Sequence, residues 1–260
     1  MKLSGALFTV FALLAVSSCV LPVSQDGRAG DSGEIVVAAA SNLTDAFAEL
    51  GERFTRKSGV RVVYSFGATA DLARQIENGA PFDVFAAADA KHVDDLLQQG
   101  LIVPGTRALY ARGRLVLWVP EGGRARLSRI EEITNAEVGK IAIARPDIAP
   151  YGQAAVEALR VLNLWEEAEP RIVYGQSVSQ AKQFASKGDA DAAFIPRALV
   201  KAGEGQVIEV DERLHQPIEQ ALGVVQASGK HEAARRFLDF VLSPEGQELL
   251  ERYGYRKPPT

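Results

Sequence analysis

From Glu34 onward, short apolar runs alternate with stretches in which apolar residues recur every three or four positions. The short runs predict buried strands, and the periodic stretches predict amphipathic helices. Strands that alternate with helices in this way are typical of an α/β architecture with mainly parallel sheets. We expect strands at residues 35–39, 60–66, 83–87, 115–119, 141–144, 171–174, 192–195 and 221–226.

Helices are predicted after most of these strands and at the end of the chain. A last helix is expected to open at Ser243 and Pro244, because a capping residue followed by Pro at the first helical position is a typical helix start. The other helices carry apolar sets that begin at Leu43, Leu72 and Val93, or lie near residues 153–162, 178–186 and 231–242.

The amino-terminal segment has the pattern of an export signal. Lys2 is followed by an uncharged, mostly apolar stretch over residues 3–16, then by two serines and Cys19, the only cysteine of the chain. Such a stretch is too short for a spanning helix and is typical of a signal peptide. Its end resembles a lipobox, although a buried structural thiol or half of a disulfide is the alternative for Cys19. We expect a lipoprotein signal peptide over residues 1–19, with Cys19 lipidated, and a flexible tether over residues 20–33.

Composition and charge exclude some functions. The 260 residues are 47% hydrophobic and 24% charged, which is ordinary for a globular protein. The formal net charge is −4, and loss of Lys2 with the leader makes it −5. This balance argues against nucleic acid as a partner, since its binding requires neutralisation of phosphates. An anion would also be repelled by the overall field, so any anion site has to act locally.

Four predicted strands end in turns that contain small, hydroxyl or amide residues just before a helix. Ser41 and Asn42 lie in the first, Thr69 in the second, Tyr151 in the third and Val178 in the fourth. The simpler interpretation is that the hydroxyls only cap helices. Helix N-termini, however, also offer free amides and positive potential to an anion. Turns at the carboxyl ends of strands can converge on one ligand, as in open α/β folds.

Catalytic chemistry finds little support. His92, His215 and His231 form no spaced ligand pair, and we expect all three to be solvated at the surface. The chain has no nucleophile elbow, Walker loop or dinucleotide-binding fingerprint. We therefore predict no catalytic residue and no cofactor.

At these turns the chain resembles the periplasmic molybdate- or tungstate-binding components of ABC transporters. The resemblance extends from Ile35 to Tyr255, and the markers occur together and in order. They are AAASNLTDAF at 38–47, SFGAT at 65–69, QIENGAPFDVF at 75–85, AD at 88–89, GRLVLW at 113–118, APYG at 149–152 and YGY at 253–255.

The resemblance implies a type II periplasmic-binding-protein fold, in which two α/β lobes joined by two crossover segments close on the ligand. By position, Ser41 and Thr69 would each donate a hydroxyl and a backbone amide to the oxyanion. Tyr151 and Val178 would donate backbone amides, and Asn42 a side-chain amide. These five residues form the molybdenum or tungsten oxyanion site that the resemblance implies.

One position departs from the family pattern. Many members have a tyrosine hydroxyl late in the second lobe, where this chain has Ile195, and Asn42 would replace that donor. We expect the first lobe over residues 34–110 and 223–260 and the second over 111–222.

The function implied by the resemblance is that of an extracytoplasmic binding protein and not of an enzyme. It would capture molybdate or tungstate, without a cofactor, and deliver it to an ABC permease and its ATPase. We expect a monomer in the periplasm or on the outer face of the cell membrane, held there only by its lipid anchor. The alternatives are a sulfate binder, a binder of a small organic acid through Arg145 or Arg197, and a sensory lipoprotein of the same fold. A deaminase of similar fold would need a cysteine that the folded part lacks.

Overall fold

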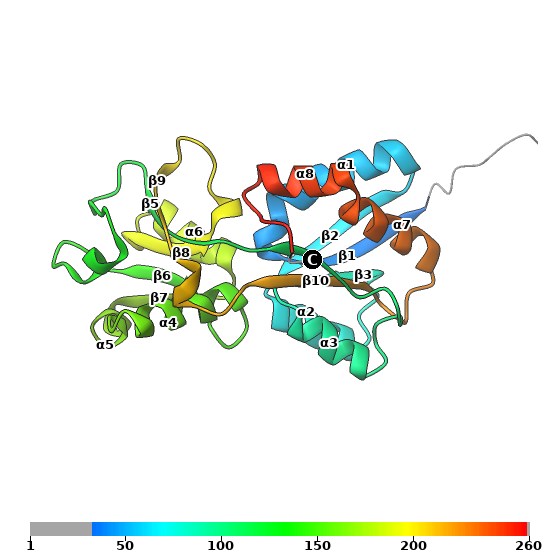
Figure 1. Cartoon of the computed structure of the whole chain (residues 1–260), viewed down its shortest axis with the longest axis horizontal. Coiled ribbons are helices and arrows are strands. Elements are labelled where there is room, and N and C mark those ends of the chain that lie inside the picture. Colours follow the sequence, from blue (N-terminus) through cyan, green and yellow to red (C-terminus); the bar gives the residue numbers. More distant parts are fainter. Residues whose placement is uncertain (1–32, 259–260) are drawn as a thin grey trace, which may run out of the picture.

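The computed structural model describes residues 33–258 and contains two five-stranded sheets (Figure 1). The strands are β1 Glu34–Ala40, β2 Arg61–Gly67, β3 Val84–Ala86, β4 Ala108–Arg112, β5 Leu115–Pro120, β6 Ile141–Ala144, β7 Ile172–Gly175, β8 Ala192–Pro196, β9 Gly205–Glu209 and β10 Glu219–Val224. The first sheet has the order β2-β1-β3-β10-β4 and the second β7-β6-β8-β5-β9. The predicted two-lobed α/β fold is confirmed.

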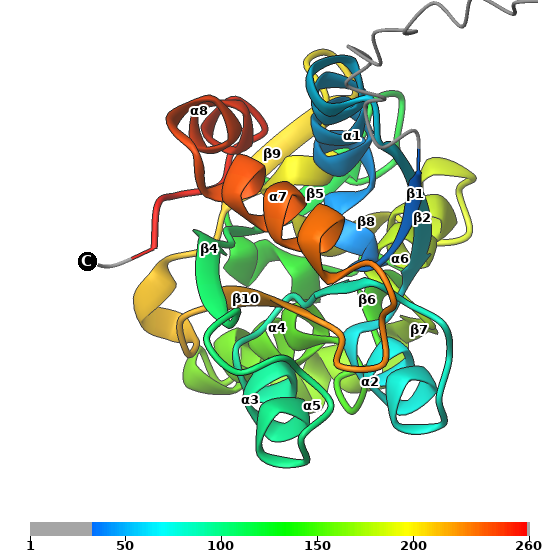
Figure 2. The ribbon, with the colours of Figure 1, turned by 90° about the vertical axis from the view of Figure 1, so that its right-hand side faces the viewer.

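Helices cover both faces of each sheet. They are α1 Thr44–Ser58, α2 Thr69–Glu77, α3 Lys91–Gln98, α4 Pro150–Val161, α5 Trp165–Ala168, α6 Val178–Ser186, α7 His231–Leu242 and α8 Pro244–Arg252. Figures 1 and 2 show α1, α7 and α8 on one face of the first sheet and α2 and α3 on the other. The alternation of β1 explains this, because Val37 packs in one apolar cluster with Phe47 while Ala38 packs in another with Leu72.

One strand in each sheet runs against the other four. β10 is antiparallel to β3 and β4, and β5 is antiparallel to β8 and β9, whereas the remaining pairs are parallel. Each reversed strand is the first that the chain forms after it crosses from the other sheet. Such a strand starts at the edge that faces the other lobe, where β1 and β6 end, so its direction is opposite. The sheets are otherwise parallel, as the alternating pattern predicts.

The structure also corrects the sequence-based elements. β4 and β9 were not predicted, and β9 is a short strand at the sheet edge in which only Ile208 is buried while Gln206 and Glu209 are exposed. The predicted lobe boundary at Gly223 falls inside β10, so residues 219–222 belong to the first sheet, as do residues 111 and 112. The pattern missed the start of β10 because Glu219 and Gln220 are polar. The other lobe limits remain predictions.

The predicted leader, Cys19 and almost all of the tether lie outside the described residues. Within residues 33–258, none of the helices combines the length and the apolar character that a membrane crossing requires.

Candidate functional site

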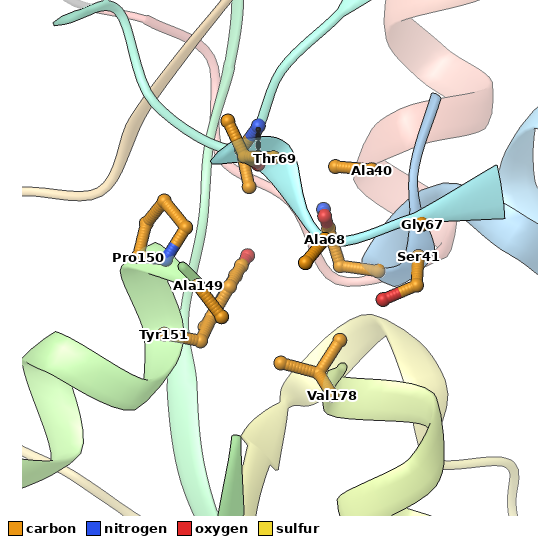
Figure 3. A pocket seen from close by; sticks show the side chains of 11 residues that line it. Ala40, Ser41, Gly67, Ala68, Thr69, Ala149, Pro150, Tyr151 and Val178 are labelled. Carbon is orange, nitrogen blue, oxygen red and sulfur yellow. Dashed lines mark hydrogen bonds between the residues drawn. The ribbon is translucent and has the colours of Figure 1, made fainter. Parts of the chain in front are cut away.

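A small pocket lies between the two sheets, where four strand-to-helix turns meet (Figure 3). The turns follow β1, β2, β6 and β7. The pocket has an empty volume of about 200 Å³ and is lined by Ala40, Ser41, Asn42, Gly67, Ala68, Thr69, Ala88, Ala149, Pro150, Tyr151 and Val178. All five residues predicted as ligands therefore line the same pocket, three from the first lobe and two from the second.

The described part of the pocket wall carries no side chain that is charged near pH 7. Among residues 33–258, its lining includes no Asp, Glu, Lys, Arg or His. Arg145 instead donates to Asp147, with Nε 3.1 Å from Oδ1, and Arg197 donates to the carbonyl of Val200 at 2.7 Å. Neither of the arginines considered for a carboxylate ligand lines the pocket.

Ser41 lies in a one-turn 3-10 helix, Ser41–Leu43, between β1 and α1. Ala40 and Leu43 occupy the two N-cap positions, and neither makes a side-chain capping bond. The capping interpretation of Ser41 is therefore wrong, and its hydroxyl faces the pocket (Figure 3). The carbonyl of Ser41 accepts a bond from the Ser179 hydroxyl at 3.1 Å, which links the two lobes beside the pocket.

Thr69 is the first residue of α2 and not its cap, because the N-cap position belongs to Ala68. Its side chain is buried, and its Oγ1 accepts a hydrogen bond from the backbone N–H of Ala88 at 3.1 Å. A hydroxyl that already accepts one bond still has its own proton to donate. Thr69 can thus serve as a neutral donor that Ala88 holds in place.

The second lobe presents two helix N-termini. Tyr151 is the second residue of α4, after Pro150, and Val178 is the first residue of α6. Amides in the first turn of a helix have no intrahelical acceptor, so these two N–H groups are available to a ligand. Ser177 is the true cap here, since its side chain accepts from Gln180 N at 3.3 Å. Gly152 lets α4 approach β6, because a Cβ there would meet the Ala144 carbonyl oxygen at 2.1 Å.

Asn42 is buried and its side-chain amide is already bonded within the protein. Nδ2 donates to Oε1 of Gln220 and to the hydroxyl of Tyr255, each at 2.9 Å. A side-chain amide has two N–H donors, and both are used in this arrangement. The expectation that the Asn42 side chain is a free donor is therefore not met, and its backbone N–H is the group left to face a ligand.

The hydrogen-bonded network around Asn42 was missed from the sequence. Gln220 Nε2 donates to the Tyr151 hydroxyl at 2.8 Å, and the Tyr110 hydroxyl lies 2.8 Å from Gln220 Oε1 and 2.9 Å from the Ala87 carbonyl oxygen. Burial raises the pKa of Tyr110, Tyr151 and Tyr255 above the ordinary tyrosine value. The network is therefore neutral near pH 7. The only signal in the sequence was that polar Gln220 directly precedes the apolar run predicted as a strand at 221–226, and the structure places it inside β10.

The histidines remain apart from the pocket. His92 contacts Asp89, with Nδ1 2.7 Å from Oδ2, and His231 lies 3.2 Å from the Gln226 carbonyl oxygen. His215 is buried, with Nδ1 2.7 Å from the carbonyl oxygen of the next residue, so the expectation of a solvated side chain is wrong there. In the part of the chain that the structure describes, no three His, Cys, Asp or Glu residues form a group that could hold a metal ion.

The chain is similar to known binding proteins along nearly its whole length. A family model described as bacterial extracellular solute-binding protein matches residues 35–256. The molybdate-binding protein ModA of Rhodobacter capsulatus is 37% identical over 245 residues, 94% of each chain. The putative ABC transporter substrate-binding lipoprotein YvgL of Bacillus subtilis is 27% identical over 98% of each chain.

The structure of the Azotobacter vinelandii periplasmic molybdate-binding protein superposes with a TM-score of 0.82 and 31% identity, covering 86% of this chain and 100% of that one. The resemblance that the motifs predicted is confirmed, and the chain belongs to the bacterial extracellular solute-binding protein family.

Proposed function

We propose that this protein captures molybdate or tungstate in the pocket between its lobes and delivers the anion to an ABC importer. The observation that carries the proposal is the chemistry of the pocket wall. It combines hydroxyls, small residues and helix N-termini, and among the described residues it includes no charged side chain. Relatives named as molybdate-binding proteins, which this chain matches over nearly their whole length, support the choice of ligand.

Neutral donors are sufficient to hold a dianion. A hydrogen bond to a charged acceptor contributes roughly 1.5–3 kcal/mol, so several bonds together offset the loss of hydration. The hydroxyls of Ser41 and Thr69 and the amides of Tyr151 and Val178 surround the same space. The N-termini of α4 and α6 add positive potential, which acts locally against the net negative charge of the chain. A cage of fixed radius favours molybdate and tungstate over the smaller sulfate.

This proposal makes the protein a carrier and not an enzyme. The bound anion is cargo, so no reaction and no cofactor are required. Delivery requires a permease and an ATPase in the membrane, to which a monomer would dock. We place the protein in the periplasm or on the outer face of the cell membrane.

A thermal-shift panel tests the ligand. A ligand that binds only the folded state raises stability by RT ln(1 + [L]/Kd). Molybdate and tungstate should raise the melting temperature at low concentration, sulfate should do so only at much higher concentration, and a dicarboxylate should have no effect. A larger shift with sulfate or the dicarboxylate than with molybdate would replace the proposed ligand by that rival.

Membrane anchoring through Cys19 is a separate part of the proposal, supported by the leader pattern and by a relative named as a lipoprotein. One acyl chain gives only marginal membrane binding, so we expect more than one on the mature cysteine. Mass spectrometry of protein from the membrane fraction should find a diacyl or triacyl adduct on an N-terminal Cys19. A mature N-terminus elsewhere, or a free thiol, would refute the anchor and leave the ligand proposal intact.

A further inference from the structure

Gln220 joins the two halves of the pocket without lining it. Its side chain is fully buried, and its Oε1 accepts from Asn42 Nδ2 in the first lobe at 2.9 Å. Its Nε2 donates to the Tyr151 hydroxyl in the second lobe at 2.8 Å. Asn42 and Tyr151 both lie on the pocket wall. One side chain therefore bonds to a wall residue from each lobe.

Gln220 sits where the chain crosses between the lobes. The two crossing segments pair there, with Gly113 N donating to the Ile218 carbonyl at 2.8 Å. The pairing of β10 with β4 shifts register between Gln220 and Ala221. A bulge of this kind changes the direction of a side chain, and bulges are frequent beside functional sites. Here it accompanies a glutamine whose polar end reaches both lobes.

The space around the Gln220 amide is filled. A Cβ at Gly113 would meet the Tyr151 hydroxyl at 2.1 Å and Gln220 Nε2 at 2.7 Å. Because the Tyr151 hydroxyl and the Gln220 amide are tightly packed beside Gly113, a change in the length or rotamer of Gln220 should shift Tyr151 relative to Asn42.

We propose that Gln220 is a positioning residue for anion binding, which holds the two lobes' halves of the pocket at the separation the ligand requires. The inference rests on the proposed function, since it concerns the same pocket. The carboxamide suits this position because it both donates and accepts without charge. A leucine of similar size would leave the Asn42 amide and the Tyr151 hydroxyl without these bonds.

The first experiment is a double-mutant cycle on molybdate affinity. Gln220→Leu and Tyr151→Phe each remove one end of the same hydrogen bond, and Tyr151→Phe keeps the backbone amide at the pocket. Each should weaken binding by about tenfold to a hundredfold. The double variant should lose little more than either single variant, because coupled residues are not additive. Gln206→Leu is the control, since Gln206 Nε2 bonds to the carbonyl of Leu127 in the second lobe, and neither residue lines the pocket or belongs to the network. It should change affinity by less than about twofold and add to Gln220→Leu.

The second experiment separates positioning from general support of the fold. In Gln220→Glu, a protonated carboxyl can still donate and accept, whereas an ionised one places a negative charge beside the dianion. Burial raises the pKa of such a carboxyl. Affinity should therefore be close to that of the parent near pH 5 and fall by at least about tenfold by pH 8. Besides burial, the charge of Asp89 raises the pKa of Tyr110, and that of Asp45 raises the pKa of Tyr255. The parent carries both aspartates, so its pH profile is the reference.

The outcomes are distinct. If the parent binds molybdate and the folded Gln220→Leu and Tyr151→Phe variants bind it within about twofold of the parent affinity, this inference is wrong. The proposed function then still stands. A flat pH profile for Gln220→Glu does the same. If Gln220→Leu fails to fold, Tyr151→Phe and Gln220→Glu decide the matter, because both keep the side-chain volume. Absence of molybdate binding by the parent overturns the proposed function and this inference with it.

Discussion

The phenol of Tyr255 bonds to both ends of Asn42: its hydroxyl accepts from Nδ2 at 2.9 Å and donates to the Asn42 main-chain carbonyl at 2.7 Å. A residue three positions from the end of the described chain thus fixes a residue of the pocket wall. The second Nδ2 proton goes to Gln220. These hydrogen bonds hold Asn42 in place on the pocket wall. Its side-chain amide could donate to a ligand only if one of the bonds were broken.

Tyr255→Phe should destabilise the fold, because one buried side-chain N–H of Asn42 and its main-chain carbonyl lose their bonds to the Tyr255 hydroxyl. Loss of one partner of a buried hydrogen bond costs about 1–3 kcal/mol. The urea midpoint should fall with an unchanged slope. Tyr174→Phe is the control, since Tyr174 is 42% exposed on β7, and it should be neutral. An equal midpoint for the two variants would contradict the account of the Asn42 contact.

Ser41→Ala should weaken molybdate binding while leaving the unliganded protein almost as stable as the parent. Ser41 is not a cap, so the lost hydroxyl matters only in the complex, where one donor to a dianion contributes roughly 1.5–3 kcal/mol. Ser177→Ala is the matched control, because Ser177 caps α6. It should cost about 0.5–2 kcal/mol of stability with and without ligand. Melting both variants with and without saturating molybdate separates the two roles, and the same ligand-induced gain in Ser41→Ala as in the parent would remove Ser41 from the site.

Gly152→Ala should impair both stability and binding. The added methyl group would overlap the Ala144 carbonyl oxygen, so the first turn of α4, which carries Tyr151, has to move. Such overpacking typically costs about 1–3 kcal/mol. At Gly229, where a Cβ would meet nothing within 4 Å, the same substitution should be neutral. Calorimetry and urea unfolding measure both effects, and wild-type affinity in Gly152→Ala would show that the turn is not a rigid part of the site.

Alkaline pH should destabilise the protein through its buried tyrosines. Burial raises the pKa of Tyr110, Tyr151 and Tyr255 in the folded state, whereas in the unfolded chain they ionise near the ordinary value of about 10. Above that pH the unfolded state holds fewer protons, so stability falls by about 1.4 kcal/mol per pH unit for each tyrosine. Below it the contribution is fully present. Unfolding free energies between about pH 8 and 11 should show this decline, with a smaller slope in Tyr255→Phe; an unchanged slope would mean that Tyr255 ionises freely in the fold.

The local part of the site could be predicted from the sequence. Ser41, Thr69, Tyr151 and Val178 each follow a strand within seven residues, and strand ends in a parallel sheet share one edge, so their meeting follows from the pattern. The bounds of α6 and α7 coincide with the predicted 178–186 and 231–242. Ser177 caps α6 with its side chain, whereas Lys230 at the N-cap of α7 makes no such bond, so apolar periodicity alone located α7.

The network behind the pocket could not be predicted. Its members at positions 42, 110, 151, 220 and 255 come from distant parts of the chain, and only the bulge in β10 and the return of the C-terminus bring them together. The same limit explains the capping error at Ser41. A serine before a helix looks like a cap, and only the inserted 3-10 turn shows that the helix starts later, at Thr44.

The central claim is that neutral donors alone hold the anion, and molybdate titration calorimetry across pH tests it most directly. Hydroxyls and amides do not titrate between about pH 6 and 9, and the network tyrosines stay protonated there. The dissociation constant for molybdate should therefore stay constant over this range, within about twofold, and remain far below that for sulfate. A steep loss of affinity as the pH rises would show that a histidine or lysine binds the anion directly, and would contradict the account.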